Sequence, residues 1–483
     1  MRRFLILPVI VLAGCAVGPD FRRPDAPAVE GYTREPLPEL TVGAAVPGGE
    51  AQRFVNGLDL PAQWWTLFRS EALNSLVEQA LKANPGLQAA QAALRVAEET
   101  YLAQRGALFP AAEASFQPTR QRVADPLTSP LNSGASVFNL HTAQLTVGYA
   151  PDVFGGVRRQ VESAQALAES QRFQLEAAYL TLTSNVVAAA VQEAALRAQI
   201  AATEEIVKLE GEQVGLMQKQ LELGAIAESS LIAQRAALAQ AQATLAPLRR
   251  QLAQQRNLLT ALAGRFPADE VAERFTLADL RLPEELPVSL PSKLVAQRPD
   301  VRAAEAQLHA ASAQVGVATA NLLPQFNITA NVGSVATTIG SLFSSGTGFW
   351  ALAGSVTQPL FQGGALVHRK RAAEAAYDEA AAQYRGSVIG AFQNVADALR
   401  ALQYDAEALK AALDAKLLAD DSLGIARRQL ELGDISTLGL LVAEQAYQQS
   451  VIALVQAQAS RYADTAALFQ ALGGGWWNRD ARE

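Results

Sequence analysis

An internal duplication constrains the fold of this chain more than any other feature of its sequence. Three pairs of segments carry the match: QLELG at 220–224 and again at 429–433, Asn84-Pro85 and Arg298-Pro299, and Ala261–Gly264 and Ala471–Gly474. Each copy runs in the same order: a helix, a short alternating section, a very long helix, a turn and a helix.

The duplication divides the chain into segments. We expect a signal peptide at 1–14, an extended tether at 15–60, a first repeat at 61–264, a connector at 265–293, a second repeat at 294–475 and a tail at 476–483. The tether and the connector are both rich in proline, which favours extended chain and turns. Each repeat contains a strand pair, near 111–150 in the first and near 325–360 in the second.

Long helices are predicted where proline is absent. No proline stands between Pro151 and Pro247, and none follows Pro359. Because proline inside a helix costs about 3 kcal/mol, both spans permit helix throughout. The stretch Gly156–Leu223 would then form a helix of about 100 Å at 1.5 Å per residue. Its apolar residues recur at steps of four and three, as in a coiled-coil seam, at Leu196, Ile200, Val207, Val214, Met217 and Leu221, with Thr203 and Glu210 as exceptions.

Four short segments alternate between apolar and polar residues, as β-strands with two different faces do. They lie near 112–117, 143–149, 325–333 and 349–356, and loops rich in Ser, Gly and Thr separate them at 129–136 and 334–348. This pattern is typical of membrane β-strands. Four strands cannot close a barrel, and lipid leaves no strand edge unpaired, so copies of the chain must share one. A dimer with 8 strands and a trimer with 12 both satisfy this requirement, since small barrels have about eight.

The N-terminus predicts export and lipidation. A basic start, Met1-Arg2-Arg3, precedes the apolar run Phe4–Leu12, which is shorter than the about 20 residues that span a bilayer. Leu12-Ala13-Gly14-Cys15 resembles the lipobox of bacterial lipoproteins, in which Cys15 would carry diacylglycerol and an N-acyl chain. The alternative is an ordinary buried cysteine. By resemblance to lipoprotein sorting rules, Ala16 in place of Asp permits transfer to the outer membrane.

Several classes of function are disfavoured. The net charge is −7 and no basic run is present, so nucleic-acid binding has no support. One cysteine and three histidines far apart in sequence make a zinc site improbable. An enzyme would need a nucleophile, a base and an orienting group, and no motif supplies them. We therefore predict no catalytic residue, no metal ligand and no cofactor besides the lipid on Cys15.

The residues quoted so far, with several others in the right order, resemble one family. The segments that carry the resemblance are Cys15–Pro24, Trp64-Trp65, Asn84-Pro85, Arg298–Asp300, Pro359–Gly364 and Ala471–Trp476. The similarity extends over nearly the whole mature chain. They are similar to the TolC-like lipidated outer-membrane factors of RND-type multidrug efflux pumps, the NodT type.

The resemblance implies a mainly α fold with a small β part. Long duplicated helices would form an α-barrel across the periplasm, and four transmembrane strands per protomer would form a 12-stranded barrel in a homotrimer. An equatorial belt would come from residues near 60–75, 265–295 and the C-terminus. The protein would sit in the Gram-negative outer membrane, anchored in its lipid, and extend into the periplasm. A periplasmic adaptor protein and an inner-membrane RND-type transporter would complete the pump.

The resemblance also implies two functional regions at the helix ends. Gly224, Ala225, Gly433 and Asp434 would form tip turns that meet the adaptor, although both turns could also be simple helix ends. Leu438, Leu441 and Val442 would line a narrow aperture, with Leu438 as an apolar constriction that gates by excluding water. Packing between helices is the alternative for Leu440, Leu441 and Val442. Many members carry Asp at the position of Val442, so Asp434 and Glu444 are candidates for partial substitutes.

Two other functions keep much of this pattern. A duct for type I protein secretion would have the same fold with a different cargo. A structural coiled-coil lipoprotein would explain the helical seam and the anchor, but it leaves the duplicated strand pairs unexplained.

Overall fold

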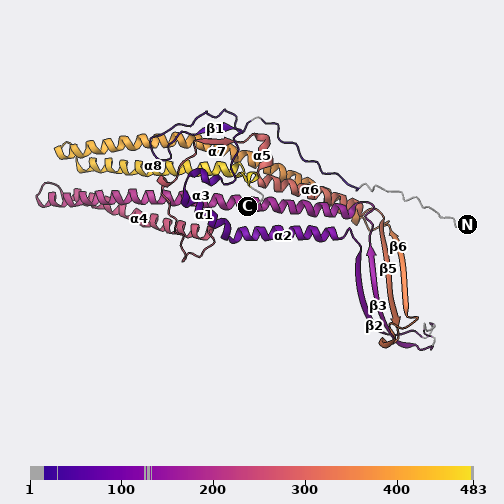
Figure 1. Ribbon diagram of the computed structural model, residues 1–483. Coiled ribbons are helices and arrows are strands. Elements are labelled where there is room, and N and C mark those ends of the chain that lie inside the picture. The colour runs from indigo at the N-terminus through magenta and orange to yellow at the C-terminus, as the bar shows by residue number, and fades with distance from the viewer. Residues whose placement is uncertain (1–15, 30, 125–126, 128–130, 132, 480–483) are drawn as a thin grey trace. The chain divides into compact units, whose positions relative to one another are not determined.

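The computed structural model describes residues 16–29, 31–124, 127, 131 and 133–479 (Figure 1). The predicted signal peptide at 1–14 and Cys15 lie outside these residues. The described chain is mainly helical with a small β part, as the sequence predicts. The helices are α1 (Glu71–Ala83), α2 (Pro85–Gly106), α3 (Gly156–Glu222), α4 (Glu228–Leu262), α5 (Pro291–Gln297), α6 (Pro299–Ala320), α7 (Ala365–Leu432) and α8 (Thr437–Ala471). Among the described residues, no helix combines the length and the apolar character that a membrane crossing needs.

The chain packs as two compact units, which cut across the two sequence repeats. The sheet unit contains the described residues up to Pro24, Leu94–Gln171 and Ala304–Tyr384. The hairpin unit contains Asp25–Ala93, Arg172–Ala303 and Arg385–Glu483. Each unit therefore takes material from both copies. The repeats at 61–264 and 294–475 describe the duplication of the sequence, and the units describe which residues pack together.

The four predicted strands form one antiparallel sheet in the sheet unit (Figure 1). The strands are β2 (Ala111–Arg122), β3 (Val137–Tyr149), β5 (Gln325–Ala336) and β6 (Gly348–Thr357), in the order β2-β3-β5-β6. β3 and β5 come from different repeats and pair with each other, from His141 opposite Ala336 to Tyr149 opposite Ile328. β5 continues through Ala336, three residues into the predicted loop, because Ser334 still pairs with both neighbouring strands.

The register keeps the two faces of this sheet chemically distinct. Leu145 opposes Ala114 on one side and Val332 on the other, and Val332 opposes Trp350. Paired residues of antiparallel strands project to the same face, so these apolar side chains share one face. The exposed large apolar side chains on that face are Phe116, Val137, Leu145, Ile328, Val332, Trp350, Leu352 and Val356. The opposite face carries Glu113, Gln117, Gln144, Thr146, Asn327, Thr329, Asn331 and Ser355.

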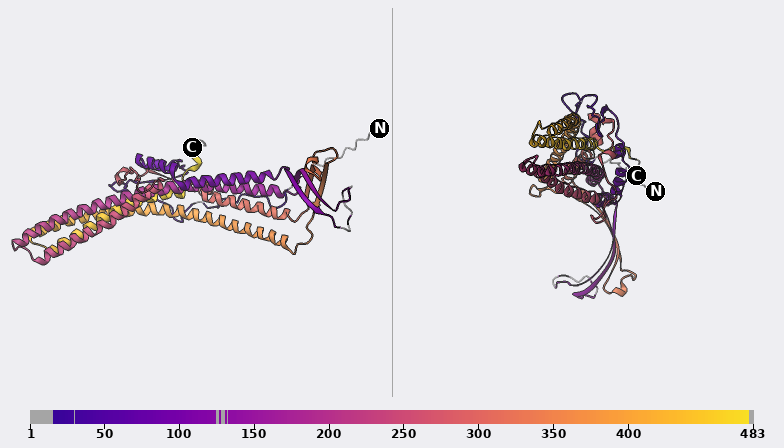
Figure 2. Two further views of the ribbon diagram at one scale, coloured as in Figure 1. Left: turned by 90° about the horizontal axis from the view of Figure 1, so that it is seen from below. Right: turned by 90° about the vertical axis from the view of Figure 1, so that its left-hand side faces the viewer.

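The hairpin unit is built on two helical hairpins. Figure 2 shows α3 beside α4 and α7 beside α8. Three of the six predicted seam residues of α3 are buried, Leu196, Ile200 and Met217, and the other three, Val207, Val214 and Leu221, are half-buried. The two exceptions in the seam, Thr203 and Glu210, are buried as well. The Thr203 hydroxyl donates to the Gln199 carbonyl at 2.7 Å, which lets a polar side chain occupy a seam position.

The two repeats bond to their own helix ends in the same way. The Asn84 side chain donates to the carbonyl of Leu262, at the end of α4, at 3.0 Å. The Arg298 guanidinium donates to the carbonyl of Ala471, at the end of α8, at 2.9 Å. These bonds satisfy carbonyls that a helix C-terminus leaves without partners. In the turn after α4, the backbone amide of Arg265 donates to the carbonyl of Thr260 at 3.0 Å. In the turn after α8, the backbone amide of Gly474 donates to the carbonyl of Phe469 at the same distance. Gly264 therefore corresponds to Gly473, one residue earlier than the sequence match suggests.

Part of the segment predicted as a tether is folded. β1 (Arg53–Asn56) pairs in parallel with β4 (Glu285–Val288), and Gln52 beside it is fully buried. The Gln52 amide donates to the Pro283 carbonyl at 3.0 Å and accepts from the buried Arg461 guanidinium at 2.7 Å. The expectation that 15–60 is only an extended tether is wrong for this stretch. Strands of four residues are too short to show an alternating pattern, and the polar Gln52 gave no sign of burial.

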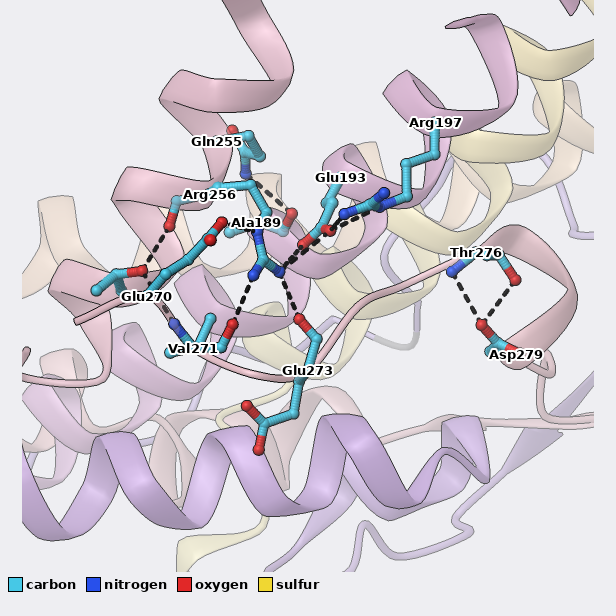
Figure 3. A network of polar contacts seen from close by, with 11 residues as sticks. Ala189, Glu193, Arg197, Gln255, Arg256, Glu270, Val271, Glu273, Thr276 and Asp279 are labelled. Carbon is cyan, nitrogen blue, oxygen red and sulfur yellow. Dashed lines mark hydrogen bonds and ion pairs between the residues drawn. The ribbon is translucent and has the colours of Figure 1, made fainter. Parts of the chain in front are cut away.

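A buried ionic network fastens the connector to the first hairpin (Figure 3). Arg256 of α4 lies 2.6 Å from Glu270 and 3.3 Å from Glu193, which is fully buried on α3. Its guanidinium also donates to the backbone carbonyls of Val271, at 2.5 Å, and Glu273. Arg197 also contacts the Glu193 carboxylate, at 2.6 Å. Every charge in the network has a partner, as burial requires.

The first prediction concerns the two faces of the sheet. We expect Val332→Arg to destabilise the protein folded in lipid by about 2–4 kcal/mol, because it places a charge on the face predicted to contact lipid. Asn331→Arg, one residue away on the opposite face, is the control and should cost much less. Urea titration of folding into phospholipid vesicles measures both. Equal costs for the two variants would contradict the assignment of the faces.

The second prediction concerns the ionic network. Arg256→Ala removes the partner of several buried acceptors and should lower the free energy of unfolding by about 3 kcal/mol. The control is Arg249→Ala in the same helix, whose pair with Glu204 at 2.8 Å is exposed on both sides, so less than about 1 kcal/mol is expected. Denaturant unfolding followed by far-UV circular dichroism compares the two. A similar loss of unfolding free energy in both variants would show that the buried network stabilises the fold no more than an exposed ion pair does.

Candidate functional site

The two predicted tip turns have the same backbone geometry. After α3, Gly224 donates to the Leu221 carbonyl at 2.9 Å and Ala225 donates to the Gln220 carbonyl at 2.8 Å. After α7, the Gly433 amide donates to the Leu430 carbonyl at 3.1 Å. The Asp434 amide donates to the Gln429 carbonyl at 2.8 Å. This pair of bonds is the Schellman motif, whose capping residue adopts the left-handed conformation. The identical QLELG segments therefore fold into identical helix ends.

Glycine is required at both turns. Gly224 has a φ of 73° and Gly433 a φ of 79°, a region where a side chain on the residue is unfavourable. A Cβ atom added at either position would meet no atom of the chain within 4 Å. All four predicted docking residues are exposed. The turns thus present open surface, and the glycines are needed for backbone conformation rather than for close packing within the chain.

The candidate aperture residues differ in exposure. Leu438 and Val442, one helical turn apart on α8, are 65% and 60% exposed, and Leu441 is half-buried. Leu440 is 3% exposed and packs with Leu423 and Ala426 of α7. Packing inside the chain therefore accounts for Leu440. It does not account for Leu438 and Val442, which form an exposed apolar pair.

The two candidate acidic substitutes also differ. Asp434 is exposed at the tip, but Glu444 is buried and accepts a bond from the Gln234 amide of α4 at 3.4 Å. Burial raises the pKa of Glu444, because it disfavours the charged carboxylate. The expectation that Glu444 could take the place of an acid at the aperture is wrong for this reason, since its side chain faces the other hairpin.

Sequence reasoning missed the polar residues that join the two hairpins. Gln234 of α4 contacts Glu444 of α8, and Gln448 of α8 donates to Glu210 of α3. Burial raises the pKa of Glu210, which stands at a seam position. The one available signal was the interruption of the apolar seam at Glu210. It indicated a polar contact without naming the partner.

Across residues 16–479, wherever the chain is described, no group of three or more His, Cys, Asp or Glu side chains is placed to hold a metal ion. The candidate surfaces are an apolar pair near the start of α8, two glycine turns, and a sheet with one polar and one apolar face. These features suit passage and docking.

Comparison with known proteins gives the family. The profile described as outer membrane efflux protein matches residues 76–265 and 290–474. The chain is 31% identical over 477 residues to the probable efflux pump outer membrane protein TtgC of Pseudomonas putida, covering 98% of this chain and 96% of TtgC. It is 30% identical over 452 residues to the pyoverdine export outer membrane protein OpmQ of Pseudomonas putida, covering 90% and 93%.

Solved structures agree with this result. The outer-membrane channel OprN matches with a TM-score of 0.84 and 26% identity, covering 96% of this chain and all of that one. The open state of the MtrE outer membrane channel of Neisseria gonorrhoeae matches with a TM-score of 0.79 and 27% identity, covering 96% and 99%. The predicted TolC-like fold and Gram-negative outer-membrane location are confirmed. The chain belongs to the outer membrane efflux protein family and is an outer-membrane efflux channel that extends into the periplasm.

Proposed function

We propose that the chain is the outer-membrane subunit of a tripartite efflux pump, in which three copies form a passive duct for small molecules. The observation that carries the proposal is the four-stranded sheet with one apolar and one polar face. With the apolar face toward lipid, the polar face lines a lumen. The subunit performs no chemistry, so transport is driven by an inner-membrane RND-type transporter that a periplasmic adaptor connects to the duct.

The tip turns are the surface proposed for the adaptor. Gly224 and Ala225 in one hairpin and Gly433 and Asp434 in the other are exposed and share one geometry. A partner that binds one turn can therefore bind the other in a similar way. The aperture is proposed at Leu438, Leu441 and Val442, where a ring of apolar side chains from three copies would exclude water. Lipid on Cys15 is proposed to anchor each copy.

The cargo is proposed to be small molecules. Among the relatives, one is named a toluene efflux pump outer membrane protein and another a pyoverdine export outer membrane protein. Both names refer to small molecules, which favours a small-molecule cargo over the protein cargo of a type I secretion duct.

Deletion of the gene in its host tests the proposed function. We expect accumulation of an efflux-reported dye to rise and drug susceptibility to increase, with both restored by the wild-type gene. Complementation with Cys15→Ser tests separately whether the lipid is needed. Normal dye accumulation together with missing secreted proteins would favour the type I duct instead.

The third prediction concerns the tip turns. Gly433→Ala should cost about 1 kcal/mol locally, because alanine disfavours the left-handed conformation. The matched control is Gly424→Ala within α7, where the added methyl group meets no atom within 4 Å and should stabilise the helix by about 0.5–1 kcal/mol. Amide hydrogen exchange in the 420–440 region should become faster in the first variant and slower in the second. The same change in both would contradict the assigned turn.

The fourth prediction concerns the aperture. Leu438→Ala shortens the side chain proposed as the constriction, so the resting conductance in planar lipid bilayers should rise. The control is Ile232→Ala in α4, an exposed apolar residue of the other hairpin that is not assigned to the aperture. An unchanged conductance for Leu438→Ala, or an equal rise for both variants, would contradict the role of Leu438.

A further inference from the structure

A hollow of about 570 Å³ lies on the apolar face of the four-stranded sheet. Its floor is a row of three small residues that pair across neighbouring strands: Ala143 of β3, Ser334 of β5 and Gly348 of β6. The next row contributes the larger side chains of Leu145 and Val332 as one wall. Because paired residues project to the same face, a row of small residues beside a row of larger ones leaves a depression there.

The loop between β5 and β6 lies over the same face. The Ser334 hydroxyl donates to the Leu342 carbonyl and lies 2.6 Å from the Thr347 hydroxyl, which donates to the Leu342 carbonyl at 2.8 Å. Since Ser334 projects to the apolar face, these bonds hold the loop on that side. Gln144 and Gly333 also border the hollow, and because their positions project to the other face, they contribute main chain to its bottom.

Phe343 of this loop forms a second wall. Its side chain borders the hollow and is 83% exposed, whereas the neighbouring Leu342 is buried. The loop is fixed by its own bonds as well, since the Ser341 hydroxyl donates to the Thr338 carbonyl at 3.0 Å. A site that is already ordered loses less conformational freedom when a ligand enters it. The aromatic side chain is therefore held beside the hollow before anything binds.

The hollow lies toward the outer end of the sheet. At one end of the sheet, β2 and β3 connect to α2 and α3, and β5 and β6 connect to α6 and α7 (Figure 1). The β5–β6 loop lies at the opposite end. In a channel whose helices extend into the periplasm, this loop end faces the exterior. The hollow therefore lies at the level of the outer leaflet of the membrane.

A basic side chain lies further out on the same face. Phe116 pairs with Ala143 of the hollow, and Arg120 follows four residues later in β2. Arg120 thus projects to the same face, about 13 Å nearer the exterior, and it is exposed. A guanidinium binds phosphate through parallel hydrogen bonds, and basic sites at a membrane surface bind anionic head groups. The face presents a hollow for an acyl chain and, further out, a cation for a phosphate.

We propose that the hollow is a binding site for lipopolysaccharide, the phosphorylated glycolipid of the outer leaflet. One of its acyl chains fills the hollow, and Arg120 contacts one of its phosphates. This rests on the proposed function, which turns the apolar face toward lipid. A chain on a flat face touches the protein on one side, whereas a chain in the hollow meets the floor and both walls. Those dispersion contacts are lost when the hollow is empty, and such contacts drive association within lipid.

Native mass spectrometry of the full-length protein in mild detergent tests the site. The probe is lipid A, the acylated and phosphorylated part of lipopolysaccharide. Gly348→Leu fills the hollow, and we expect it to raise the Kd for lipid A about tenfold. The matched control is Gly354→Leu, on the same face of the same strand but outside the hollow, which should leave the Kd unchanged. A Cβ atom at Gly348 comes no closer than 3.9 Å to another atom, and one at Gly354 meets none within 4 Å, so the strand accepts both changes.

The phosphate contact is tested with Arg120→Gln. This change removes a charge-assisted hydrogen bond, so it should raise the Kd for lipid A about tenfold and leave that for dephosphorylated lipid A unchanged. Arg105→Gln on α2, another exposed arginine of the sheet unit, is the control and should change neither value. Phosphatidylglycerol, an anionic phospholipid, should bind more weakly than lipid A to the wild-type protein.

Three results would overturn the proposal: an unchanged Kd in Gly348→Leu, an equal rise in Gly354→Leu, or equal affinity for phosphatidylglycerol and lipid A. An unchanged Kd in Arg120→Gln would overturn the phosphate contact. If Gly348→Leu does not assemble, Phe343→Ala removes the second wall from an exposed loop position and must raise the Kd instead. Dye accumulation in the deletion strain, with and without the wild-type gene, is measured in parallel. No difference there would overturn the proposed duct, whereas a normal duct without these lipid effects would overturn the lipid site alone.

Discussion

Backbone hydrogen bonding in lipid is the constraint on which the rest of this structure depends. In the order β2-β3-β5-β6, the outer edges of β2 and β6 have no partner strand among the described residues. Unpaired amide and carbonyl groups cost several kcal/mol each in hydrocarbon, so an open sheet does not persist there. In the proposed channel the chain therefore completes its sheet with copies of itself. Pairing of β6 with β2 of a neighbour, repeated around a ring, satisfies both edges at once and gives a heterologous interface that closes.

The duplication serves this arrangement in both compact units. In the sheet unit the two copies meet at the β3–β5 pair, which joins them through nine consecutive residue pairs and keeps the polar and apolar faces continuous. In the hairpin unit Asn84 and Arg298 hold the ends of α4 and α8 by equivalent bonds. Polar contacts between hairpins, such as Gln234 with Glu444, bury groups that need specific partners. Such contacts define which faces meet, because any other pairing leaves a buried group unsatisfied.

Local pattern predicted much of the fold, and long-range contacts explain what it missed. The absence of proline located α3 within one residue at its end, and alternation located all four strands of the large sheet. Alternation could not find β1 and β4, because four residues carry too little pattern. The spacing on α8 did not separate exposed Leu438 from buried Leu440, since that depends on where α7 lies. Nothing near Asp20 in sequence indicated that Arg159, on α3, would bind it.

The number of copies in the channel tests the account most directly. Native mass spectrometry of the protein extracted from the outer membrane in mild detergent measures it without assuming any interface. The account predicts three copies of the processed chain, each with the mass of its lipid, and therefore 12 strands from four per copy. A complex of two copies would match the dimeric barrel that the strand count also allows, and a single copy would leave both sheet edges open; either result would contradict the account.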